Sequence, residues 1–352
     1  MEKQDIKSLN LQQLTEAIAT FSMPKFRAKQ IYQWLHIQLV GSFDEMTNLS
    51  KKDRELLEKH FYITCLTPVE VLTSKIDGTK KYLFALKDGN IIESVLMRYK
   101  HGNSVCISSQ VGCRMGCRFC ASTLDGLERN LTASEMLDQI YRIQKETGER
   151  VSNVVVMGSG EPLDNYENLV QFIHLISNKD GLCISQRNIT VSTCGIVPNI
   201  KKLADENLSI TLALSLHAPN NEVRQGLMPI AKKYELSEVL SACQYYFEKT
   251  GRRITFEYSL VKDVNDNIEE AKALIQLISG MNCHVNLIPV NPIKERDFVQ
   301  SNKENIEKFK KLLEKNKINV TIRREMGRDI DGACGQLRKR YLESSLNSKD
   351  AF

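Results

Sequence analysis

Three cysteines lie close together in one glycine-containing segment of this chain. Cys113, Cys117 and Cys120 follow the pattern C-x3-C-x2-C, which ten cysteines placed at random over 352 residues would seldom produce. Three thiolates can bind a cubane [4Fe–4S] cluster and leave one iron open to a small molecule. A structural zinc site usually combines two separated ligand pairs, and a disulfide framework belongs to small secreted domains. The spacing therefore predicts an iron–sulfur cluster with an open iron.

A second motif follows the cysteines. Residues 158–162 read Gly-Ser-Gly-Glu-Pro and come directly after the apolar run 154–157. Gly-x-Gly by itself usually marks only a turn. Because this one follows a strand-like run and the cysteine triad, we interpret it as a turn that approaches a bound ligand.

Together these motifs resemble those of the radical S-adenosylmethionine (SAM) enzymes. Two further segments narrow the resemblance: VCISSQVG at 105–112, which leads into the triad, and DGACGQL at 331–337. Over roughly residues 20–340 the chain is similar to the RlmN-type RNA methyltransferases, which methylate carbon 2 of an adenine in 23S rRNA and in some tRNAs. It departs from their usual wording at Ser159, where methionine is common.

The resemblance implies two cofactors, a [4Fe–4S] cluster on Cys113, Cys117 and Cys120 and SAM at the open iron. It also implies that Gly160 and Glu161 hold the methionine amino group of SAM. The other implied SAM contacts are Ser192, Ser215, Leu216, His217 and Asn291. Taken singly, such residues are often caps or turn residues. They follow strand-like runs, however, where a barrel places its ligands.

The resemblance gives two more cysteines a role in the reaction. Carbon 2 of adenine is electron-poor, so it attacks the methyl group of SAM badly, whereas a carbon radical can add to it. Cys334 is implied to take a methyl group from a first SAM. A 5′-deoxyadenosyl radical from a second SAM removes hydrogen from this S-methyl group, and the methylene radical attacks adenine. Cys106 is implied to release the RNA by forming a disulfide with Cys334.

Glu93 is implied to be the base that removes the ring proton at carbon 2. By its own pattern it alternates with apolar residues, which is also typical of an outward position on a strand. Five cysteines have no implied role, and we interpret them as structural. They are Cys65, Cys183, Cys194, Cys243 and Cys283.

Helix-like and strand-like runs predict the fold that must position these residues. Residues 1–62 read as a helical accessory domain, and residues 63–102 as a small linking β-sheet of hairpins with Asp-Gly turns. Strand-like runs then begin near residues 105, 154, 189, 210, 254, 285 and 320, mostly with helices between them. This α/β alternation predicts a parallel sheet, and the resemblance implies a partial (β/α)6 barrel over residues 103–340. Residues 341–352 read as a disordered tail.

Composition indicates the cellular location and the partners to expect for the protein. It is 42% hydrophobic and 26% charged, has no run near the ~20 apolar residues of a membrane span, and begins without an apolar signal segment. We therefore expect a cytoplasmic monomer with reduced cysteines. The net charge of +5 is weak evidence for RNA. The implied partners are 23S rRNA, tRNA and a one-electron donor such as flavodoxin or ferredoxin.

Three points stay open: which carbon is methylated, which class of substrate the enzyme acts on, and whether the accessory domain contacts RNA. A Cfr-type enzyme would methylate carbon 8 of adenine with the same cysteine pair, although Gly-Glu-Pro and the segment 32–36 favour carbon 2. A radical SAM activase acting on a glycyl residue would need neither Cys106 nor Cys334. In the accessory domain, basic residues near Tyr32 and Trp34 form either a solvated face over an aromatic anchor or an RNA-contacting surface.

Replacing Cys113, Cys117 or Cys120 by alanine should abolish the brown absorbance of the reconstituted cluster and all methyl transfer, because the cluster then lacks a ligand. Iron and sulfide content and the visible spectrum measure the first effect. Cys183→Ala should keep both properties. A triad variant with an intact cluster and full turnover would show that the ligand assignment is wrong.

Overall fold

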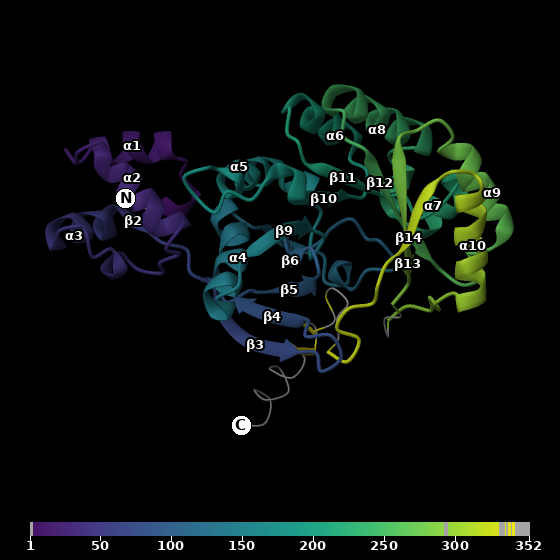
Figure 1. Cartoon of the computed structure of the whole chain (residues 1–352), viewed down its shortest axis with the longest axis horizontal. Helices are drawn as coiled ribbons and strands as arrows, with labels where there is room; N and C mark the ends of the chain where they lie inside the picture. The colour runs from purple at the N-terminus through teal and green to yellow at the C-terminus, as the bar shows by residue number, and fades with distance from the viewer. Residues whose placement is uncertain (1–2, 292–294, 331–334, 336, 339, 342–352) are drawn as a thin grey trace.

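A single curved sheet is the frame of the molecule (Figure 1). The structure is a computed structural model that describes residues 3–291, 295–330, 335, 337–338 and 340–341. Within them the sheet has ten strands in the order β14-β13-β12-β11-β10-β9-β6-β5-β4-β3. Because β14 and β3 are both edges, the sheet is an open, partial barrel, and the predicted α/β fold is confirmed.

Seven parallel strands carry the barrel. They are β6 (Gly102–Ile107), β9 (Val151–Val156), β10 (Ile189–Thr193), β11 (Thr211–Ser215), β12 (Ile254–Leu260), β13 (Cys283–Pro289) and β14 (Asn319–Ile322). Each of the seven strand-like runs falls in one of them. The crossovers between them contain α4 (Ala133–Thr147), α5 (Tyr166–Ser177), α6 (Val197–Asp205), α7 (Asn221–Leu227), α8 (Leu236–Thr250), α9 (Ile268–Leu277) and α10 (Lys303–Lys315). Six strand–helix units are thus followed by β14 as the last strand.

The linking strands extend the barrel's own sheet. They are β3 (Thr67–Thr73), β4 (Lys80–Ala85) and β5 (Ile91–Tyr99), close to the predicted runs. Instead of forming a separate small sheet, β5 pairs antiparallel with β6, with Val95 opposite Cys106. This pairing satisfies the backbone groups along an edge of β6 that would otherwise be left unpaired.

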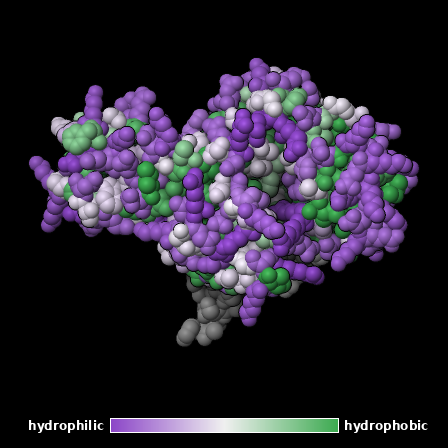
Figure 2. All heavy atoms as spheres, viewed as in Figure 1, coloured by the Kyte–Doolittle hydropathy of each residue, from purple (hydrophilic) through white to green (hydrophobic). Residues whose placement is uncertain are grey.

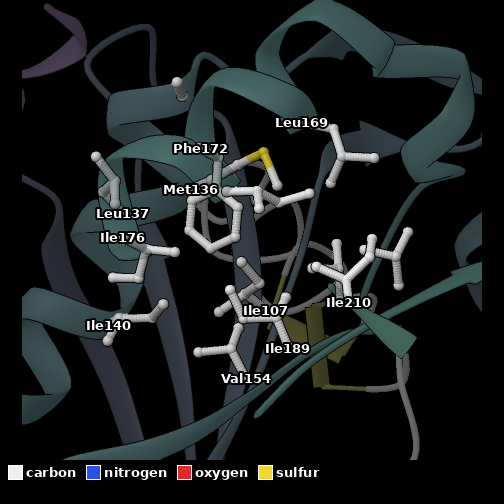
Figure 3. Close-up of a cluster of buried hydrophobic side chains, with 14 of the residues drawn as sticks. Ile107, Met136, Leu137, Ile140, Val154, Leu169, Phe172, Ile176, Ile189 and Ile210 are labelled. Atoms are coloured by element: carbon white, nitrogen blue, oxygen red, sulfur yellow. The ribbon is translucent and has the colours of Figure 1, made fainter. Parts of the chain in front are cut away.

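Helices α4 and α5 pack against the outer face of β6, β9 and β10 (Figure 3). The side chains that meet there are fully buried and include Ile107, Met136, Leu137, Ile140, Val154, Leu169, Phe172, Ile176 and Ile189. A capping box begins α4, since the Thr132 hydroxyl accepts from the Glu135 N–H. This apolar layer holds the strands whose ends carry the site.

The N-terminal region is a helical unit beside α4 and α5 (Figure 1). It contains β1 (Gln4–Asp5), α1 (Leu11–Ala19), α2 (Phe26–His36), α3 (Lys51–His60) and β2 (Phe61–Tyr62). Lys7, just after β1, is fully buried, and its Nζ lies 2.6 Å from Oδ1 of Asp138 on α4. The other oxygen of Asp138 accepts from the Leu66 N–H at 2.6 Å. One buried carboxylate therefore ties this unit and its linker to the barrel.

Within the residues that the structure describes, no helix is long and apolar enough to cross a membrane. Figure 2 shows a mainly hydrophilic face with small, scattered apolar areas.

Asp138→Ala should lower the free energy of unfolding by about 3 kcal/mol, because it leaves the Lys7 ammonium buried without its partner. Urea unfolding followed by circular dichroism measures the change. As a control, Glu167→Ala removes a mostly exposed ion pair with Lys202 and should cost less than about 1 kcal/mol. Equal losses in the two variants would contradict a docking role for Asp138.

Candidate active site

The carboxyl ends of the parallel strands surround a cavity of about 510 Å³. Ten of the predicted site residues line it, namely Cys106, Cys113, Cys117, Cys120, Gly160, Glu161, Ser192, Ser215, His217 and Asn291. Leu216 is fully buried in the main hydrophobic core instead. Glu93 lies in β5 outside the cavity lining, and Cys334 lies outside the described residues. The fold thus brings together most of the residues that the sequence singled out.

The cysteine loop is shaped by a short hairpin that sequence patterns did not predict. β7 (Gln110–Gly112) pairs with β8 (Leu127–Asn130), and the Cys113 N–H donates to the Gly126 carbonyl at 2.7 Å. Gly112 has a φ of +74°, and a Cβ there would overlap the Gly126 oxygen. Glycine is therefore required directly before the first cysteine.

Burial favours the protonated form of the Cys113 and Cys117 thiols. Burial, together with the neighbouring Cys120 and Glu161, raises the pKa of Cys113 to about 12. Burial likewise raises the pKa of Cys117 well above its usual range. Within the described residues, no three such side chains converge closely enough in this conformation to chelate a metal ion. Iron binding would therefore turn the three thiols toward one centre and displace their protons.

The Gly-Ser-Gly turn packs against the backbone just after β6. A Cβ on Gly158 would lie 2.7 Å from the Ile107 carbonyl oxygen, and Gly160 has a φ of +108°. The Ser159 carbonyl accepts from the Gln110 N–H at 3.1 Å. The Ser159 hydroxyl donates to the Gly112 carbonyl at 3.4 Å, so the serine has a partner within the turn.

Backbone groups hold the carboxylate of Glu161. It accepts from the Cys194 N–H at 2.8 Å and from the Leu163 N–H at 3.1 Å. Burial raises the pKa of this carboxyl, and these hydrogen bonds partly offset the effect. Nearby, Arg114 Nε donates to Asp164 at 2.8 Å and ties the cysteine loop to the same turn. The loops after β6 and β9 therefore form one connected wall.

His217 is a neutral donor at the opposite wall. Its Nδ1 accepts from the Ser259 N–H at 2.9 Å, so the proton is assigned to Nε2. Burial, together with the charge of Arg224, lowers the pKa of His217 to about 3. The ring of Phe119, from the cysteine loop, meets it edge-on at 4.6 Å between centroids. The imidazole can therefore donate to a ligand but carries no charge at neutral pH.

Sequence reasoning missed three polar groups around the cavity. Arg224 on α7 is fully buried and donates to the Cys194 carbonyl at 2.8 Å and to the Leu216 carbonyl at 3.2 Å, which joins the loops after β10 and β11. Cys194 and Glu257 line the cavity itself. Each is a single residue in an ordinary run, and no local pattern distinguishes it.

Cys106 and Glu93 lie on the neighbouring strands β6 and β5, and the described residues just after Cys334 reach Glu93. Cys106 is buried in β6 and lines the cavity. The Glu93 carboxylate accepts from the Gly335 N–H at 2.7 Å and the Arg338 N–H at 2.6 Å, and Lys81 Nζ lies 3.2 Å away. Gly335 also packs against Ala121, directly after Cys120. The residue that follows Cys334 in sequence therefore touches both β5 and the cysteine loop.

The chain is similar to known proteins over nearly its whole length. Residues 107–277 match the model of the radical SAM superfamily, and residues 4–63 match that of the ribosomal RNA large subunit methyltransferase N-terminal domain. A probable dual-specificity RNA methyltransferase RlmN from Lachnospira eligens is 68% identical, over 99% of this chain and 99% of its own length. The chain belongs to the RlmN family. Another RlmN relative, from Lachnoclostridium phytofermentans, is 63% identical over 98% of this chain and 97% of its own length.

A crystal structure supports the same assignment. A radical SAM methyltransferase from Sphaerobacter thermophilus is 42% identical and matches with a TM-score of 0.91, over 95% of this chain and 98% of that one. Membership of the RlmN family confirms that the protein is a radical SAM methyltransferase that uses a [4Fe–4S] cluster and SAM. The roles of single residues remain predictions.

Gly335→Ala should slow methyl transfer at least roughly tenfold. Its φ is +82°, which costs alanine about 1–2 kcal/mol, and the new Cβ would lie 2.9 Å from the Ser122 nitrogen, so the segment must shift. Initial rates of methyl transfer measure the loss. In the control Gly148→Ala, φ is +67° but nothing lies within 4 Å, so the rate should not change. Full activity of Gly335→Ala would refute a requirement for this contact.

Proposed function

We propose that this chain methylates carbon 2 of a specific adenine in 23S rRNA and of an adenine in tRNA, with two SAM molecules per turnover. One observation carries the proposal: Cys106 and the three cluster cysteines line one cavity, and Gly335, the neighbour of Cys334, packs against the same cysteine loop. A simple one-step methyl transfer would need no such pair of thiols. The names of the relatives, which are dual-specificity RNA methyltransferases, support RNA as the substrate class.

Cys334 acts first in this scheme, as the methyl carrier. Its thiolate attacks the methyl group of one SAM, a C–S bond forms, and S-adenosylhomocysteine leaves. When bound, the cluster and a second SAM supply one electron and the 5′-deoxyadenosyl radical that takes a hydrogen atom from this methyl group. The methylene carbon on Cys334 then bonds to carbon 2 of adenine. The RNA is at this stage covalently attached to the protein.

Glu93 is suited to take the ring proton from carbon 2. It is buried in β5, the strand that pairs with β6 and hence with Cys106. Loss of this proton to Glu93 and of one electron to the oxidised form of the one-electron carrier restores the aromatic ring. The carboxylate already accepts from the Gly335 and Arg338 N–H groups, so the C-terminal segment must shift before Glu93 can reach the base.

Cys106 then releases the RNA. Its thiolate attacks the sulfur of Cys334, a disulfide forms, and the electron pair of the C–S bond goes to the methylene carbon, which takes a proton and becomes a methyl group. A cellular thiol must reduce this disulfide with two electrons before the next turnover. The electron that starts each cycle is proposed to come from flavodoxin or ferredoxin.

The N-terminal unit is proposed to contact the RNA. Tyr32 is fully buried and serves as a core anchor, so it is not available to stack on a base. Phe26, at the start of α2, is 61% exposed, and the guanidinium of Arg27 lies 5.2 Å from its ring centroid. An exposed aromatic ring next to cations suits both the stacking of a base and contact with phosphate.

Mass spectrometry of nucleosides tests the proposal. The reconstituted enzyme, given 23S rRNA or tRNA, SAM and a reductant, should produce 2-methyladenosine. Cys106→Ala should instead accumulate a protein–RNA adduct, because no thiol resolves it, whereas Cys334→Ala should give neither product nor adduct. Wild-type formation of 8-methyladenosine, or normal turnover by Cys106→Ala, would overturn the proposed reaction.

A further inference from the structure

A fully buried arginine beside the cysteine loop has no acidic partner. The guanidinium of Arg224, on α7, donates to three backbone carbonyls, those of Cys194 at 2.8 Å, Leu216 at 3.2 Å and Ser215 at 3.3 Å. Its remaining nitrogen, Nη1, is buried and has no hydrogen-bond partner among the described residues, and no carboxylate of theirs pairs with the guanidinium. A guanidinium keeps its charge inside a protein, and a buried charge without a counter-charge is costly. We therefore expect an anion to form or bind beside Arg224.

Helix α7 packs directly against the cysteine loop. The N–H of Arg118, the residue after Cys117, donates to the Leu227 carbonyl at 2.9 Å at the end of α7. The side chains of Cys117, Cys194 and Leu227 also pack in one apolar cluster. Leu227 is three residues after Arg224 and so lies on the same side of the helix. The face of α7 that carries Arg224 is therefore turned toward Cys117.

The groups that can supply the counter-charge are cysteine sulfurs. Burial lowers the pKa of Arg224, and negative charge on Cys194, Cys117 and Cys243 acts in the opposite direction. Burial and the neighbouring cysteines raise the pKa of Cys117, whereas the charge of Arg224 lowers it. Of these three thiols, Cys117 alone is a predicted cluster ligand. Iron binding displaces the thiol proton and leaves a thiolate there, which is the anion that Arg224 lacks.

A buried cation at this place affects how readily the cluster is reduced. An oxidised [4Fe–4S] core with three thiolates already carries a net negative charge, and one electron from the carrier adds a second. A fixed positive charge stabilises the more negative, reduced form most, because Coulomb interactions are strong in a buried, low-dielectric setting. Net charge and hydrogen bonds to the sulfurs are among the factors that set the reduction potential of such clusters.

We propose that Arg224 is the counter-charge of the iron–sulfur cluster and raises its reduction potential by stabilising the reduced form. It is a positioning residue, because it contacts the loops after β10 and β11 and acts on the cluster through Cys117. The inference rests on the predicted ligand role of Cys117 and does not depend on which carbon of adenine is methylated.

A redox titration of the anaerobically reconstituted enzyme without SAM, followed by electron paramagnetic resonance, tests the inference. In Arg224→Gln the amide can still donate to a carbonyl but carries no charge. The equilibrium constant for one-electron reduction should fall at least roughly tenfold, which is a shift of about 59 mV to a more negative midpoint potential. Arg224→Lys keeps the charge, so its potential should lie closer to that of the wild type than to that of Arg224→Gln.

Arg252→Gln is the matched control, because Arg252 precedes β12 at the opposite end of the barrel, where its Nη2 donates to Thr211 Oγ1 at 3.1 Å. Its loss removes the same charge far from the cysteine loop and should leave the potential unchanged.

Three results would contradict the inference: an unchanged potential in Arg224→Gln, equal shifts in Arg224→Gln and Arg224→Lys, or weaker SAM binding at an unchanged potential. If Arg224→Gln cannot hold four irons, Arg224→Lys must still hold them, and loss of iron from both variants would also contradict it. The expected shift in an enzyme that makes no 2-methyladenosine would refute the proposed function alone.

Discussion

The close approach of two backbones at the ends of β6 and β9 is the contact on which the site depends. The Gly158 N–H donates to the Ile107 carbonyl at 2.9 Å, and no residue with a Cβ fits there. The register of the two strands, with Ile107 opposite Val156, sets this contact. Because parallel strands end at the same rim, the pairing brings the cysteine loop beside the glycine turn, and Arg114 and Asp164 then join the two.

The two faces of the sheet differ in chemistry near the cavity. The outer face is apolar and packs on α4 and α5 (Figure 3). The inner face carries Ser215, Glu257 and Asn286 in register, where a closed barrel would hold a packed apolar interior. Polar groups of this kind need ligand or water partners. An open barrel with a cavity gives them access to such partners.

Buried contacts with α4 fix the orientation of the N-terminal unit. Lys7 and Asp138 are both fully buried, and His36 on α2 lies 2.8 Å from the Tyr141 hydroxyl on α4. Burial lowers the pKa of His36 to about 3, so this contact does not change charge near neutral pH. A fixed distance between the proposed RNA-contacting surface and the cavity follows from these contacts. Deleting the unit would also expose buried charge on α4, so single surface substitutions are the cleaner way to study RNA binding.

Local patterns in the sequence determined the cysteine triad, the glycine turn and the strands and helices that carry them, because strong periodicity and short spacing need no distant partner. They did not reveal the β7–β8 hairpin, whose strands are only three and four residues long. The tertiary structure alone decided the partners of Glu93, and it alone placed Arg224 and Glu257 at the cavity. Each of these side chains depends on groups brought together from other strands and loops, and such long-range pairing leaves no local pattern to read.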